Sequence, residues 1–172
     1  SHFLCSGLGP EDLYGCYMTE EEGEAIRVFP ILEKLRYLVP FHRVDETIAY
    51  LRERATEDGE RCAVLHDDGE KFGVWPGTSK WVFDEGWLEK FFDMIDKNLD
   101  WIKPSTLGEF LDHEEPVGHT YLPNTSYMEM GEWSLPADAS RDYIDLIEEV
   151  NGWGERGERV KRFLQGGTWR NF

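Results

Sequence analysis

The sequence predicts an α/β fold in which amphipathic helices alternate with short apolar strands. Apolar residues recur at helical spacing over 44–55 and again over 87–98. The continuous apolar run at 62–65 has the character of a strand buried on both faces, and 99–102 predicts a second strand. This alternation is typical of a parallel sheet with right-handed crossovers, in an open or a barrel arrangement.

Local signals define several of the element ends. Asp45 is expected to cap the first of these helices, and Gly59 to close the turn that follows it. Thr106 and Glu109 have the spacing of a capping box, so a short third helix is predicted there. Upstream, residues 26–29 predict another strand.

The pattern changes at position 116 and divides the chain into 1–115 and 116–172. Residues 121–135 form an aromatic stretch for which we predict irregular structure. Apolar residues at helical spacing then predict helices around 143–150 and 160–164. Three strands at most are too few for a closed α/β barrel, which takes about 250 residues, so the chain is expected to be a segment of a longer protein.

Composition argues against several classes of protein. The 35 acidic against 18 basic residues give a net charge of -17, which disfavours a nucleic-acid partner. No apolar run approaches the ~18 residues of a membrane span, so no membrane partner is predicted. The three cysteines are an odd number without CxxC spacing, and no secretory leader is recognisable. These features predict a reducing, cytoplasmic location.

Three carboxylates, Asp67, Asp68 and Glu70, follow His66 just beyond the apolar run at 62–65. α/β folds place catalytic groups at this end of a strand. Crowded negative charges penalise one another's ionisation, and a carboxyl group that keeps its proton is what general acid catalysis needs. An aspartate followed by glycine is also a good turn pair, so these residues alone leave catalytic and turn roles equally open.

Aromatic residues favour a carbohydrate ligand. Trp75 lies in a glycine-rich loop after the carboxylates and is predicted to stack on a sugar ring. Tyr127 and Trp133 lie in the later aromatic stretch and are assigned the same role. Trp87 falls on the apolar stripe of a helix and is predicted to belong to the core.

His66 and the neighbouring carboxylates are an alternative set of metal ligands. Metal-dependent polysaccharide deacetylases also place Asp-Asp-Gly after a barrel strand, and they complete their zinc site with two closely spaced histidines. No such pair is found among the remaining histidines, which are His2, His42, His113 and His119. The sequence therefore predicts no metal and no other cofactor, and the deacetylase is the less favoured alternative.

The block HDDGEKFGVWPGT at 66–78 resembles a signature block of glycoside hydrolase family 57, in the branch that contains 4-α-glucanotransferases and α-amylases. Further similarity covers nearly the whole chain, at 28–30, 33–38, 121–123, 126–136 and 166–172. The resemblance implies a seven-stranded, incomplete (β/α) barrel that acts on α-1,4-glucans with retention of configuration. It assigns the general acid/base role to Asp68.

The resemblance also implies what this chain lacks. The family's second catalytic residue is a glutamate in a Trp-Leu-Thr-Glu-Arg-like motif, and nothing in 1–67 matches that motif. Residues 1–115 would then form the later half of the catalytic barrel. Residues 116–172 would supply an aromatic loop and the helices that close the barrel and lead to a helical domain.

We therefore expect a segment of a retaining 4-α-glucanotransferase or α-amylase, inactive alone, whose ligands are maltooligosaccharides. His66, Asp67 and Glu70 are expected to support Asp68. A catalytically inactive glucan-binding module that uses the same aromatic residues is the main alternative. Oligomer formation by the full-length enzyme stays open.

Overall fold

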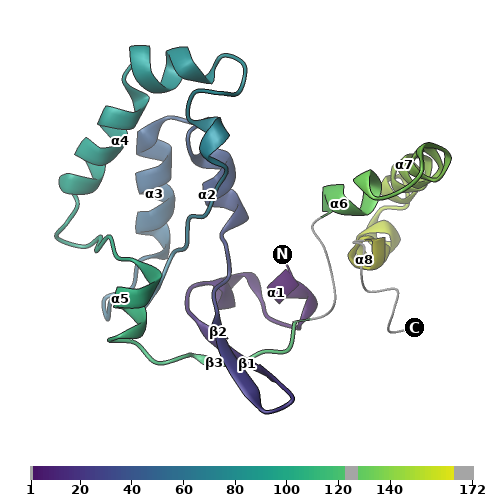
Figure 1. Cartoon of the computed structure of the whole chain (residues 1–172), viewed down its shortest axis with the longest axis horizontal. Coiled ribbons are helices and arrows are strands. Elements are labelled where there is room, and N and C mark those ends of the chain that lie inside the picture. The colour runs from purple at the N-terminus through teal and green to yellow at the C-terminus, as the bar shows by residue number, and fades with distance from the viewer. Residues whose placement is uncertain (1, 123–127, 165–172) are drawn as a thin grey trace. The chain divides into compact units, whose positions relative to one another are not determined.

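The computed structural model describes residues 2–122 and 128–164, which belong to two units (Figure 1). The larger unit comprises Glu11–His119 and carries the sheet. The smaller unit comprises Ser1–Pro10 with Thr120–Phe172, and its described elements are helices.

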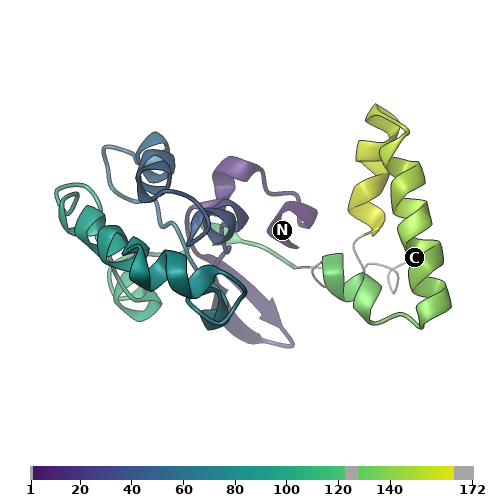
Figure 2. The ribbon, with the colours of Figure 1, turned by 90° about the horizontal axis from the view of Figure 1, so that it is seen from above.

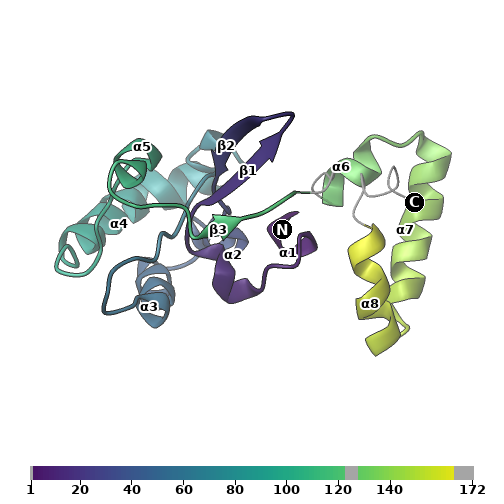
Figure 3. The same ribbon diagram turned by 90° about the horizontal axis from the view of Figure 1, so that it is seen from below.

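The sheet of the larger unit has three strands, β1 (Tyr17–Glu21), β2 (Glu24–Val28) and β3 (Gly118–His119). β1 and β2 form an antiparallel hairpin in which Tyr17 lies opposite Val28. β3 pairs with β1 in parallel, so the strand order is β2-β1-β3 (Figure 3). Two residues connect the hairpin, Glu22 and Gly23, and their φ angles of 52° and 85° suit a tight turn between twisted strands.

The predicted strand at 26–29 is confirmed as β2, but its partner β1 was missed. The sequence of β1, Tyr-Met-Thr-Glu-Glu, carries too few apolar residues to show a strand pattern. Since hairpin pairing satisfies the backbone of both strands, β1 forms in spite of its polar composition.

Four α-helices complete the larger unit, and Figure 2 shows them to one side of the β1–β2 hairpin: α2 (Glu33–Leu38), α3 (Val44–Arg54), α4 (Trp87–Asp96) and α5 (Leu107–Leu111). Shorter turns occur at Pro10–Leu13 and Gly69–Lys71, and Lys80–Asp84 is a π-helical turn. The helices predicted at 44–55 and 87–98, and after Thr106, are confirmed. α3 begins after Arg43, so Asp45 lies inside its first turn and the prediction of Asp45 as N-cap was wrong.

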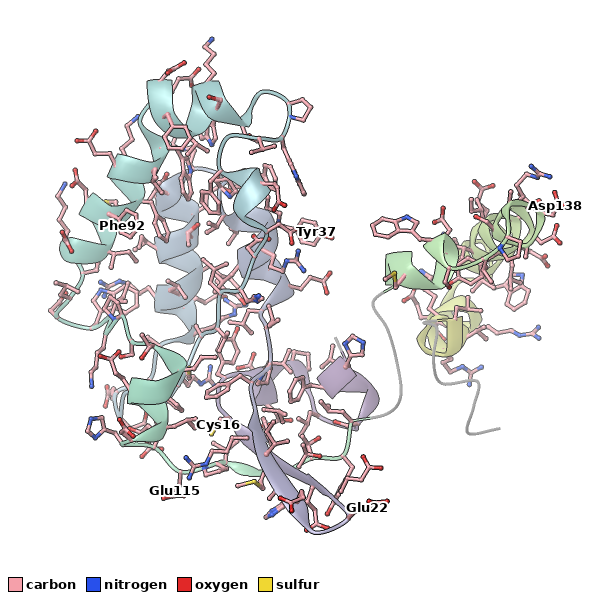
Figure 4. All side chains as sticks on the ribbon, in the orientation of Figure 1. Cys16, Glu22, Tyr37, Phe92, Glu115 and Asp138 are labelled. Atoms are coloured by element: carbon pink, nitrogen blue, oxygen red, sulfur yellow. The ribbon has the colours of Figure 1, made fainter. Side chains whose placement is uncertain are left out.

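A hydrophobic core joins α3 to α4. Its buried members are Val39, Val44, Ile48 and Trp87. Trp87 stacks on Phe91 at a centroid distance of 5.1 Å, and its indole N–H donates to the backbone carbonyl of His42 at 2.6 Å. The prediction that Trp87 belongs to the core is confirmed. On the outer sides of α4 and α2, Phe92 and Tyr37 are exposed (Figure 4).

The strand predicted at 62–65 is present only as one parallel bridge between Val64 and Ile31. The backbone N–H of Leu32 donates to the carbonyl of Val64 at 3.1 Å. Val64 is buried, whereas Leu65 is exposed. A strand in a parallel sheet normally pairs with its neighbours and is covered on both faces. A single bridge provides too few backbone hydrogen bonds to stabilise a longer strand at 62–65.

The strand predicted at 99–102 was wrong, because this segment turns back onto the end of α4. The backbone N–H groups of Trp101 and Ile102 both donate to the carbonyl of Asn98, at 3.1 and 2.8 Å. The Asn98 side chain accepts from the Trp101 indole at 2.8 Å and donates to the Met94 carbonyl at 2.7 Å. These bonds hold the segment in a turn despite its apolar sequence.

The smaller unit contains α1 (His2–Cys5), α6 (Met128–Trp133), α7 (Ala137–Asn151) and α8 (Glu155–Leu164). The helices predicted at 143–150 and 160–164 are confirmed as α7 and α8, although both begin earlier. Part of the stretch predicted to be irregular forms α6, so that prediction was wrong over 128–133.

α7 and α8 pack closely against each other. The Tyr143 hydroxyl donates to the carbonyl of Leu164 at 2.5 Å. A Cβ on Gly157 would lie 2.1 Å from the carbonyl oxygen of Val150, so this close approach requires glycine.

A small mixed sheet together with helices agrees with part of an α/β domain. The seven-stranded barrel stays a prediction. In the stretches 2–122 and 128–164, no helix combines the length and the apolar character needed to cross a membrane.

Candidate active site

The acidic block at 66–70 lies where the chain leaves the bridge at Val64. Asp68 precedes the short turn Gly69–Lys71, and its carbonyl accepts from the Lys71 backbone N–H at 3.2 Å. The carbonyl of Glu70 then accepts from the backbone N–H groups of Val74 and Trp75, both at 3.0 Å. The turn expected for an Asp-Gly pair is therefore present. The two adjacent carboxylates, Asp67 and Asp68, have different surroundings and different exposure.

Asp67 is buried and bound by two cations. Its side chain is 4% exposed, and its Oδ1 lies 2.7 Å from Nζ of Lys71 and 3.2 Å from Nε of Arg36. The same oxygen accepts from the backbone N–H of Asp68 at 2.9 Å. Its other carboxylate oxygen, Oδ2, is buried and has no hydrogen-bond partner within the described part of the chain. Asp67 is thus an anchoring group that substrate cannot reach from solvent.

Asp68 is the accessible carboxylate of the pair. Its side chain is 52% exposed, and its Oδ2 accepts from Nη2 of Arg36 at 3.2 Å. Arg36 therefore spans both aspartates with two different nitrogens. Positive charge therefore lies beside each of the two carboxylates.

Lys71 is a buried cation that links the aspartates to two aromatic rings. Its side chain is 5% exposed, and its Nζ also donates to the backbone carbonyl of Arg36 at 3.0 Å. The ammonium lies 5.2 Å from the ring centroid of Phe41 and 5.6 Å from that of Trp75. A buried ammonium needs such compensation, which here comes from a carboxylate and two aromatic faces.

Trp75 and Phe41 form a half-exposed aromatic pair. Their rings are stacked, with centroids 5.9 Å apart and planes at 22°. Their side chains are 41% and 42% exposed, so an edge or face of each ring is open to a ligand. Thr78 holds the loop, since its hydroxyl donates to the Trp75 carbonyl at 2.7 Å and accepts from the Gly73 N–H at 3.2 Å.

Gly73 allows this loop to close. Its φ is 125°, a conformation that L side chains rarely adopt. A Cβ at this position would also lie 2.7 Å from the ring of Phe83.

The remaining predicted site residues belong to different units of the chain. His66 and Glu70 lie beside the aspartates and are exposed. Trp133 ends α6 in the smaller unit and is 66% exposed. Tyr127 lies outside the described residues. The sugar-stacking roles of Trp133 and Tyr127 stay predictions.

Three residues of the site were missed by the sequence analysis: Arg36, Phe41 and Lys71. Arg36 and Lys71 lie inside the motifs quoted for the resemblance, which is the only signal that could have marked them. Their contact spans 35 positions along the chain, and no local pattern encodes it.

The Oδ1 atom of Asp67 is bound by protein cations, since Arg36 and Lys71 lie 3.2 and 2.7 Å from it. Within residues 2–122 and 128–164, no group of three or more His, Cys, Asp or Glu side chains is placed to hold a metal ion. Burial raises the pKa of the Cys62 thiol, with a smaller contribution from Cys16. A thiol that resists ionisation is a poor nucleophile.

Comparison with known proteins identifies the family. Residues 1–123 match the family described as glycosyl hydrolase family 57. The chain is 48% identical over 171 residues to a 4-alpha-glucanotransferase of Thermococcus litoralis, covering 99% of this chain and 26% of that protein. It is 47% identical over 171 residues to an alpha-amylase of Pyrococcus furiosus, with the same coverage of each.

A solved structure agrees with these sequence matches. The crystal structure of 4-alpha-glucanotransferase from Thermococcus litoralis superimposes with a TM-score of 0.89 at 48% identity. It covers 99% of this chain, which corresponds to 26% of the solved chain. The chain thus spans about a quarter of the length of the relatives that it matches. By the match over most of its length and by its structure, this chain belongs to glycosyl hydrolase family 57.

Proposed function

We propose that this chain is part of a longer retaining enzyme that acts on α-1,4-glucans, with Asp68 as its general acid/base. The observation that carries this proposal is the exposed Asp68 carboxylate, held by Arg36 beside an aromatic pair. Lys71 contacts both Asp67 and the rings of Phe41 and Trp75, so the carboxylates and the aromatic pair are neighbours. An acid next to a flat apolar surface is suited to a glycosidic bond between stacked sugars.

The proposed reaction has two steps. A carboxylate supplied from outside this chain attacks the anomeric carbon, while Asp68 protonates the departing glycosidic oxygen. Asp68 then removes a proton from the incoming group, which is a sugar hydroxyl in transfer and water in hydrolysis, as the oxygen of that group bonds to the anomeric carbon and the first carboxylate leaves. The two outcomes share this chemistry and differ in how well the acceptor sites hold a sugar. Relatives named for each activity match this chain almost equally.

The chain by itself is expected neither to hydrolyse nor to transfer α-glucans. Retaining chemistry requires a second carboxyl group about 5–5.5 Å from the first, across the scissile bond. Asp67 cannot serve, because it is buried against Arg36 and Lys71. The test is to incubate the purified 172-residue chain with maltoheptaose and separate the products by chromatography. If the chain forms new glucans and Asp68→Asn abolishes them, the nucleophile lies inside this chain. That result would overturn the proposal that the nucleophile is supplied from outside it.

The aromatic pair is proposed to bind maltooligosaccharides. Trp75→Ala and Phe41→Ala are each expected to weaken maltoheptaose binding about 3- to 10-fold in the full-length polypeptide, given about 0.5–1.5 kcal/mol for an aromatic contact. Isothermal titration calorimetry measures the affinity. Phe92→Ala is the control, because Phe92 is an exposed aromatic residue on the outer side of α4.

The binding result separates stacking from packing. If Trp75→Ala lowers the melting temperature but leaves maltoheptaose affinity equal to that of Phe92→Ala, Trp75 is a structural residue. If both variants of the pair lose binding while the full-length polypeptide shows no activity on any α-glucan, the alternative of an inactive glucan-binding module is favoured.

We also propose a cytoplasmic location, which is supported by the unpaired thiols of Cys16 and Cys62.

A further inference from the structure

We infer that Arg36 is the positioning residue of the acid/base Asp68, held in place by Asp67 and Lys71. The inference rests on the proposed function and adds a role that the sequence pattern did not indicate. Arg36 donates through Nε to Asp67 and through Nη2 to Asp68, both at 3.2 Å. One planar guanidinium therefore sets the relative orientation of two consecutive carboxylates.

The guanidinium is held from its buried side. Asp67 is 4% exposed and receives Nε of Arg36 together with Nζ of Lys71. Nζ of Lys71 also donates to the backbone carbonyl of Arg36 at 3.0 Å, so the backbone of Arg36 is bound by Lys71 while its guanidinium is bound by Asp67. Lys71, Asp67 and Arg36 form a closed ring of contacts between α2 and the acidic block.

This anchoring is what distinguishes the Arg36–Asp68 contact from an ordinary surface ion pair. An isolated exposed pair is weak, partly because two long side chains must be immobilised in one geometry. Here Nε of Arg36 is already bound by Asp67, whose carboxylate is itself held by Lys71, and Nη2 donates to the exposed carboxylate of Asp68. Arginine suits this role because its donors sit in a rigid planar fork, whereas the lysine ammonium is a point charge.

The chemical consequence concerns proton transfer to the leaving group. Asp68 is 52% exposed, and a carboxyl group at such a position samples several rotamers unless something holds it. Protonation of a glycosidic oxygen requires the carboxyl group within hydrogen-bond reach and correctly oriented. Loss of Arg36 would therefore slow the step that needs the acid, without removing the acid itself.

The test compares two substrates of the full-length enzyme. Maltoheptaose needs a protonated leaving group, whereas the fluoride of α-maltotriosyl fluoride departs without one. Arg36→Gln is expected to lower kcat/KM for maltoheptaose about 10- to 100-fold, the scale of a small misplacement of a reacting group. The kcat/KM for the fluoride is expected to stay within about 3-fold of wild type.

Two further variants sharpen the comparison. Arg36→Lys retains one charge but cannot bridge both carboxylates, so its loss with maltoheptaose is expected to approach that of Arg36→Gln. Arg43→Gln is the matched control, because Arg43 forms an exposed ion pair with Asp45 at 2.9 Å on α3. It is expected to behave as wild type with both substrates.

The outcomes separate this inference from the proposed function. If Arg36→Gln slows both substrates equally, or neither, the positioning role is wrong. If Arg36→Lys keeps full activity on maltoheptaose, a positive charge at this position is sufficient for catalysis. The requirement for a side chain that bridges both carboxylates is then refuted. If Asp68→Asn itself leaves maltoheptaose turnover intact, the failure lies in the proposed function. A misfolded fraction cannot imitate the expected result, because it would reduce the rate on both substrates.

Discussion

Replacing Asp68 with asparagine is expected to remove most turnover of α-1,4-glucans by the full-length enzyme while leaving the fold intact. The amide has the same shape and keeps an oxygen that can accept from Arg36, so the local geometry persists. It can neither donate nor take up the required proton. Because general acid/base catalysis contributes about 10²–10⁴-fold, a loss of that size is expected.

The measurement is the rate of product formation from maltoheptaose, followed by chromatography across a range of pH. Asp45→Asn is the matched control, since Asp45 is another exposed aspartate paired with an arginine. It should keep wild-type turnover. Activity of Asp68→Asn within a few-fold of the parent at every pH would show that another group transfers the proton.

Replacing Lys71 with methionine is expected to destabilise the chain by about 3 kcal/mol, at the low end of the range for breaking a buried ion pair. The Lys71 and Asp67 side chains are 5% and 4% exposed, so methionine would leave a buried carboxylate without its nearest cation. Arg36 still contacts the same oxygen at 3.2 Å, which is why a larger loss is not expected.

Urea unfolding followed by tryptophan fluorescence measures this effect. Lys80→Met is the control, because Lys80 pairs with Glu85 at 3.6 Å on an exposed surface and its loss should cost under about 1 kcal/mol. The double variant Lys71→Met with Asp67→Leu should recover much of the stability, since apolar residues often replace a buried pair without penalty. Equal unfolding midpoints for Lys71→Met and Lys80→Met would show that the buried pair does not stabilise the fold.

Elements that depend on neighbouring residues in sequence were predicted well. The capping box before α5 is an example: the Thr106 hydroxyl accepts from the Glu109 N–H at 3.2 Å, and the Glu109 carboxylate accepts from the Thr106 N–H at 2.7 Å. The Thr106 backbone N–H and, after it, the Thr106 hydroxyl, which donates to the same carboxylate, lower the pKa of Glu109. Helices α3 and α4 were likewise predicted from apolar spacing, because one helix face must pack against the core.

Elements that are determined by hydrogen bonds, and not by the spacing of apolar residues, were predicted poorly. The polar strand β1 exists because it pairs with β2 and β3. The apolar segment 99–102 is a turn because Asn98 binds the end of α4 and the Trp101 indole. In both cases hydrogen bonds determine the structure, and the spacing of apolar residues does not. Apolar spacing indicates which residues are buried, but it does not indicate which groups they pair with.

The sequence by itself determined the acidic block, the exposed aromatic loop around Trp75 and the membership in a family of glycoside hydrolases. These depend on residue types in consecutive positions. Only the tertiary structure decided that Asp67 is buried and Asp68 open, and that Arg36 and Lys71 neutralise the pair. The physical reason is that burial and ion pairing arise where α2 meets a loop more than thirty positions later, and that meeting is set by packing of the whole unit.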